Sequence, residues 1–175
     1  MLSMTVESDG SARVGGAGLD RDRLAAGAGW GVAATVLMSV VMLFGTATGL
    51  APMPSPVPLA LVARTVGALP QPALMGLAVL VHLSYGAVAA TVLAGLVRRV
   101  SVGLAVGYGS LLWALMGVVW LPYLGWGLFG TAVTPRIAVA TLVPHLVYGV
   151  TLGLALDRHR APRRSSNGTG RGPQR

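Results

Sequence analysis

"GWGVAATVLMSVVML", residues 29–43, is an uncharged apolar run that occurs a second time in the chain. The second copy, "GYGSLLWALMGVVWL" at residues 107–121, matches it at 7 of 15 positions without a gap. A second pair follows in the same order: "HLSYGAVAATVL" at residues 82–93 matches "HLVYGVTLGLAL" at residues 145–156 at 5 of 12 positions. This pair aligns two of the three histidines of the chain with each other. The two pairs predict a chain built from two similar halves.

Each of these runs lies in a longer apolar segment. The 175 residues are 54% hydrophobic and only 10% charged, with a mean hydropathy of +0.71. A helix needs about 20 apolar residues to cross a hydrocarbon core of roughly 30 Å. The segments of sufficient length are 25–49, 72–97, 102–124 and 136–156. We therefore expect an all-α membrane protein with a four-helix transmembrane domain over residues 25–156.

The order of the copies predicts how these spans are arranged. Each half contains two spans, so both halves enter the membrane in the same orientation. They are expected to form two tandem, parallel-related helical hairpins, with a pseudo-twofold axis along the membrane normal. The copies are 78 residues apart in the first pair and 63 in the second, so the first half is 15 residues longer. The extra residues fall in the proline-rich connection 51–72. Within it, "LALVARTVGAL" at 59–69 predicts a short helix at the membrane interface, with a re-entrant loop as the alternative.

The positions of the arginines predict the orientation of the chain. All 13 basic residues are arginine, and eleven of them lie in the two tails or between the second and third spans. Only Arg64 and Arg136 fall on the other side, so the positive-inside rule predicts a multi-pass protein of the cell membrane with both termini cytoplasmic. Residues 1–24 are expected to be a disordered tail. The basic tail 157–175 is expected to bind anionic lipid headgroups and no nucleic acid.

The repeated histidine motif predicts a helix-packing face. Positions +3, +4 and +8 from a histidine share its side of a helix. These positions hold Tyr85, Gly86 and Ala90 beside His82, and Tyr148, Gly149 and Gly153 beside His145. Small residues at this spacing allow helices to approach closely. Each imidazole would then hydrogen-bond a carbonyl or hydroxyl group on a neighbouring helix, with no cofactor.

Two cofactor hypotheses use the same histidines. His82 and His145 could be the axial ligands of one b-type haem held between the second and fourth spans, although no arginine lies in the interior of the spans to meet the haem propionates. Met38 and Met116, which the repeat makes equivalent, would complete a soft two-histidine, two-methionine set suited to Cu(I). Packing alone explains the same residues.

Composition excludes several classes of function. The chain has no cysteine, which excludes disulfides, thiolate nucleophiles and cysteine metal sites. Its five acidic residues lie in the tails or at a helix end, where they supply neither a catalytic cluster nor a proton path. We expect a non-enzymatic accessory, assembly or interaction module that associates with itself or with another membrane protein. The alternatives are a bis-histidine haem electron-transfer protein and a small oligomeric transporter or channel.

Several motifs are shared with known membrane proteins. The HLxYG motif in the second and fourth spans, the "LMSVVM" and "LMGVVW" segments and the connector "PMPSPVPLALVAR" resemble small four-helix prokaryotic integral membrane proteins of uncharacterised function. They are loosely similar to the YagU-type inner-membrane proteins over residues 25–158. The resemblance implies an integral membrane protein and assigns no reaction and no functional residue.

Overall fold

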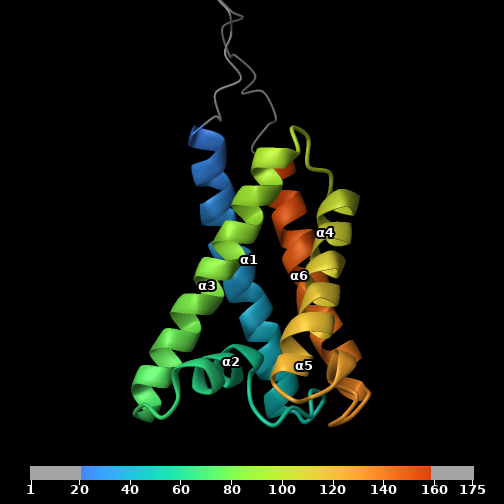
Figure 1. The fold of residues 1–175 in the computed structure, drawn as a ribbon. Coiled ribbons are helices and arrows are strands. Elements are labelled where there is room, and N and C mark those ends of the chain that lie inside the picture. Colours follow the sequence, from blue (N-terminus) through green and yellow to red (C-terminus); the bar gives the residue numbers. More distant parts are fainter. Residues whose placement is uncertain (1–20, 159–175) are drawn as a thin grey trace, which may run out of the picture.

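The computed structural model describes residues 21–158 as a bundle of helices (Figure 1). The long elements are α1 (Arg21–Ala47), α3 (Gln71–Leu96), α6 (Arg136–Arg158) and the run of α4 (Val102–Leu115), η1 (Met116–Trp120) and α5 (Leu121–Tyr123). The short ones are α2 (Val57–Val66) and η2 (Leu128–Gly130). Four of the described helices are long and apolar enough to cross a membrane. The all-α fold with four candidate spans, predicted from the sequence, is confirmed.

The long helices pair as two hairpins. α1 packs along α3, α4 packs along α6, and α1 and α6 join the two hairpins. Arg21, Arg158 and the connection between α3 and α4 lie at one end of the bundle, which we call the terminal end (Figure 1). α2 lies across the opposite end, which we call the α2 end (Figure 1).

Small residues bring the helices of each hairpin into backbone contact. A Cβ atom added to Gly31 of α1 would lie 2.6 Å from the carbonyl oxygen of Gly86 on α3. In the second hairpin, a Cβ atom added to Gly149 of α6 would lie 2.6 Å from the carbonyl oxygen of Ala105 on α4. Gly153 is just as close to α4, with its added Cβ 2.7 Å from the Cα atom of Val102. Both hairpins therefore depend on the absence of side chains at these positions.

The core changes character along the bundle. Its terminal half is one buried cluster that includes Ala90, Tyr148 and Leu152. Its α2 half holds two separate clusters, one that contains Val57 and one that contains Val62. Because both residues belong to α2, this short helix contacts two clusters that stay separate from each other.

The third span, Val102–Tyr123, contains a wider turn that was not predicted from the sequence. Residues Met116–Trp120 form a π-helical turn, in which the backbone N–H of Leu121 bonds the carbonyl oxygen of Met116. Pro122 follows directly, and its ring has no N–H and clashes with the carbonyl four residues earlier in a regular helix. A wider turn removes that conflict.

Two other boundaries differ from the predictions. α1 begins at Arg21, inside the predicted tail, where the Arg23 guanidinium donates to the carbonyl oxygen of Val97 at the end of α3. The rest of the predicted tails, 1–20 and 159–175, lies outside the described residues. The connector helix α2 ends before Gly67, whose φ of +85° is a conformation that only glycine adopts readily.

Candidate functional site

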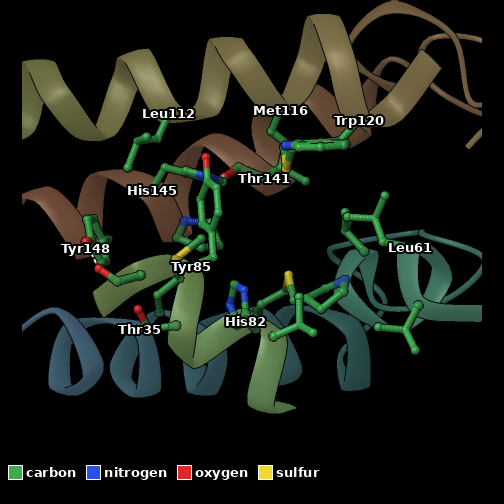
Figure 2. A pocket seen from close by; sticks show the side chains of 18 of the residues that line it. Thr35, Leu61, His82, Tyr85, Leu112, Met116, Trp120, Thr141, His145 and Tyr148 are labelled. Atoms are coloured by element: carbon green, nitrogen blue, oxygen red, sulfur yellow. Dashed lines mark hydrogen bonds between the residues drawn. The ribbon is translucent and has the colours of Figure 1, made fainter. Parts of the chain in front are cut away.

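A pocket of about 600 Å³ occupies the space between the two hairpins in the α2 half of the bundle. Its walls include Met38 of α1, Leu61 of α2, His82 of α3, Met116 of η1 and His145 of α6. Figure 2 shows Leu61 toward one end, Thr35 and Tyr148 toward the other, and the two histidines between them. Pockets of about 300–1,000 Å³ hold small molecules and cofactors in other proteins.

The mouth of the pocket opens on the side of the bundle. Val81 and Tyr85 of α3 line the pocket and are 46% and 40% exposed. Trp120 and Tyr123 line it from η1 and α5 and are 37% and 45% exposed. Residues that border both the pocket and the outside mark its rim, so the mouth lies between α3 and the η1–α5 segment. When the four long helices span a bilayer, this surface faces lipid.

The pocket lies where the helix packing departs from the symmetry predicted from the sequence. The aligned segments predict that α1 corresponds to α4 and α3 to α6. α1 and α6 pack extensively, whereas the equivalent pair of α4 and α3 does not. The mouth lies where that second contact is missing. Tyr85 and Tyr148 show the result, because Tyr148 is only 2% exposed while its equivalent Tyr85 borders the mouth.

Tyrosine hydroxyls close the pocket toward the terminal end. The Tyr148 hydroxyl on α6 donates to the carbonyl oxygen of Gly86 on α3 at 2.7 Å. The Tyr108 hydroxyl on α4 donates to the carbonyl oxygen of Ala89 on α3 at 2.9 Å. Both bonds cross from one hairpin to the other. They hold α3 against the second hairpin at this level, although the helices separate toward the α2 end.

His145 is held in one tautomer by its own helix. The residue is 7% exposed, and its Nδ1 lies 2.8 Å from the carbonyl oxygen of Thr141, one turn earlier. A carbonyl oxygen only accepts hydrogen bonds, so Nδ1 is the donor, and in the neutral ring the lone pair lies on Nε2. The interhelical bond expected for this histidine is therefore not formed through Nδ1. The bond within the helix leaves the lone pair of Nε2 available as a hydrogen-bond acceptor.

His82 lies on the wall formed by α3. It is partly buried, and its Nε2 is a buried atom without a hydrogen-bond partner among residues 21–158. His82 lies 11 residues into α3 and His145 nine residues into α6, or roughly 16 and 14 Å from the α2 ends of these helices. The two rings therefore enter one pocket at similar depth, as Figure 2 shows.

All four candidate ligands line the same pocket. His82, His145, Met38 and Met116 all line the pocket, and the two methionine side chains are 7% and 9% exposed. Within the described range, no group of three or more histidine, cysteine, aspartate or glutamate residues could hold a metal ion. The set thus consists of two imidazoles and two thioethers.

The predicted packing residues divide between two roles. Gly86 contacts α1 and also lines the pocket. Gly149 and Gly153 pack against α4, and Ala90 is fully buried in the core of the terminal half. Small residues thus pack within the hairpins, whereas Tyr148 joins one hairpin to the other.

The sequence model of a family of unknown function, DUF6789, matches residues 21–167. The match covers most of the chain, including all four candidate spans. The chain belongs to the DUF6789 family. No curated protein and no solved structure gives a significant match. The DUF6789 description names no activity, and the resemblance to YagU-type proteins stays a prediction.

Several contacts in and near the pocket of this DUF6789 protein were not predicted from the sequence. The bond of Tyr108 to α3 was not predicted, Trp120 was not assigned to the mouth, and α2 was not assigned to the wall. The available signal was weak: a tyrosine within a span needs a partner for its hydroxyl group. Periodicity alone does not say which helix supplies that partner.

Proposed function

We propose that this member of the DUF6789 family is a non-enzymatic membrane protein that binds one lipophilic molecule in the pocket between its hairpins. The position of the mouth is the main support. It opens between α3 and the η1–α5 segment, on a surface that faces lipid when the helices span a membrane. A molecule dissolved in the bilayer would enter without crossing water.

The lining of the pocket supports a neutral ligand. Of the described residues that form its walls, none is aspartate, glutamate, lysine or arginine. Most are aliphatic, methionine or aromatic residues, and a few polar groups such as Thr35, His82 and His145 lie among them. This mixture is typical of small-molecule sites, in which apolar walls supply affinity and a few polar groups orient the ligand.

The distribution of arginines supports an orientation for the binding module. We propose that it lies in the cell membrane with both termini cytoplasmic, so that the pocket lies in the outer half of the bilayer. The terminal end carries Arg21, Arg23, Arg98, Arg99 and Arg158, and the α2 end carries Arg64 and Arg136. The sequence of the C-terminal tail adds further arginines, which would bind anionic headgroups on the cytoplasmic side. A ligand-binding accessory subunit of another membrane protein fits this arrangement.

Photo-crosslinking tests the binding function. The purified protein in lipid nanodiscs is illuminated with dodecanol that carries a diazirine in its chain, and labelled peptides are mapped by mass spectrometry. Val81→Trp places a large ring at the mouth, whereas Val79→Trp places the same ring on α3 at a 58%-exposed position outside the pocket. We expect Val81→Trp to lower pocket labelling at least fivefold and Val79→Trp to leave it unchanged. Equal labelling of both variants, spread over the lipid-facing surface, would contradict the proposal.

Haem b is a second candidate ligand, favoured by the hydrogen bonding of the histidines. Histidines that ligate metals usually donate their other ring nitrogen to a carbonyl or carboxylate group, as His145 donates to Thr141. His82 lines the same pocket, and its Nε2 has no partner among the described residues. Protein purified from haem-sufficient cells would then show Soret and α bands on reduction, and His82→Ala or His145→Ala would abolish them. A colourless preparation excludes this ligand.

A further inference from the structure

We infer that the pocket recognises a hydroxyl group, so that it binds a lipophilic alcohol or phenol in preference to a ketone, ether or ester of the same shape. The inference rests on the proposed binding function and adds the chemical class of the ligand. It follows from which hydrogens and lone pairs the pocket leaves available.

The interior hydroxyl groups of the pocket already donate to the backbone. Thr35 donates to the carbonyl oxygen of Gly31 at 2.7 Å, and Thr141 donates to that of Ile137 at 2.7 Å. The Tyr148 hydroxyl donates to α3 in the same way. A hydroxyl group has one hydrogen to donate and two lone pairs that accept. These three groups therefore have no hydrogen left to donate to a ligand.

His145 has the same one-sided character. Its Nδ1 hydrogen is bonded to the Thr141 carbonyl, so Nε2 offers only a lone pair. His145 lies in the wall of a mostly apolar pocket, where a hydrogen bond is stronger than in water. A ligand that donates a hydrogen to Nε2 gains that bond. A carbonyl or ether oxygen cannot do so.

His82 does not change this balance. Its Nε2 is buried without a hydrogen-bond partner in the described chain, so that atom is not presented to a ligand in the pocket. A ligand hydroxyl group can donate its hydrogen to Nε2 of His145. A ketone of the same shape has no hydrogen to donate and leaves that lone pair unused.

Tyr85 provides the internal comparison. It is the hydroxyl-bearing residue of the α3 wall, and it is 40% exposed at the rim. If its hydroxyl group were the recognition element, it would donate to ketones and alcohols alike. Selection for a hydroxyl ligand therefore depends on His145 and not on Tyr85.

Competition against the diazirine probe tests the inference with a matched pair of ligands. 2-Dodecanol and 2-dodecanone have the same number of heavy atoms and differ in the hydrogen that the alcohol can donate. We expect the wild-type protein to need at least tenfold less alcohol than ketone for half-maximal competition, a ratio equivalent to about 1.4 kcal/mol. We expect His145→Phe to abolish the preference and Tyr85→Phe to retain it.

The outcomes separate the two proposals. Equal competition by the alcohol and the ketone in the wild-type protein overturns the hydroxyl inference and leaves lipophilic binding in place. A preference that is lost in Tyr85→Phe and kept in His145→Phe overturns the assignment to His145. Absence of competition by either compound, together with equal labelling of Val81→Trp and Val79→Trp, overturns the binding function itself. The wild-type comparison needs no variant to fold.

Discussion

Replacing Gly31 by alanine tests the backbone contact within the first hairpin. The added Cβ atom would lie 2.6 Å from both the Cβ atom of Ala90 and the carbonyl oxygen of Gly86, and 3.0 Å from the Cα atom of Ala87. Two of these three atoms belong to the backbone of α3, so no side-chain rotation relieves the overlap. α1 and α3 must move apart.

The expected cost follows from the contacts that this movement disturbs. Overpacking of a close contact costs about 1–3 kcal/mol. The displaced Gly86 carbonyl also accepts the Tyr148 hydroxyl, a bond that contributes about 1 kcal/mol. We therefore expect Gly31→Ala to destabilise the protein by about 2–4 kcal/mol.

Gly29 is the matched control, since it lies two residues earlier on the same helix. An added Cβ atom at Gly29 meets nothing within 4 Å. Alanine there removes the helix penalty of glycine, and we expect a stabilisation of about 0.5–1 kcal/mol. Reversible unfolding in mixed micelles by added SDS, followed by circular dichroism, measures both variants. If Gly31→Ala and Gly29→Ala prove equally stable, the close contact between α1 and α3 is refuted.

Two further predictions concern the link between the hairpins and the orientation of the chain. Tyr148→Phe removes the hydrogen bond from α6 to α3 and should lower the free energy of unfolding by about 1 kcal/mol in the same SDS titration. Tyr123→Phe, at the exposed rim, should change it by less than about 0.5 kcal/mol. A larger loss for Tyr123→Phe than for Tyr148→Phe would contradict the role of Tyr148 in closing the pocket. The chain has no cysteine, so an introduced single cysteine reports on which side of the membrane it lies. In intact cells a membrane-impermeant maleimide should label Ala68→Cys, at the α2 end. It should label Gly103→Cys, at the terminal end, only after lysis. Labelling of Gly103→Cys alone in intact cells would invert the proposed orientation.

The predicted repeat illustrates what a comparison of segments within one sequence can and cannot show. It aligns His82 with His145 and Tyr85 with Tyr148, and therefore predicts equivalent surroundings. In the structure, Tyr148 is buried in the core while Tyr85 lies at a pocket mouth. The difference arises because α1 packs on α6 while α4 does not pack on α3 in the same way. An approximate repeat predicts which helices pair, but not how its two copies deviate from symmetry.

The sequence by itself determined the helical fold of this protein. Runs of about 20 apolar residues form helices in a bilayer because the hydrocarbon core offers no other partner for backbone groups, and the duplicated segments indicate which helices form hairpins. Only the tertiary structure decided where the pocket lies and which side chains enter it. The extra 15 residues of the first half are visible in the sequence, but their position as helix α2 across two separate cores follows from long-range packing. Such packing depends on the shapes of surfaces that are brought together only when the chain folds.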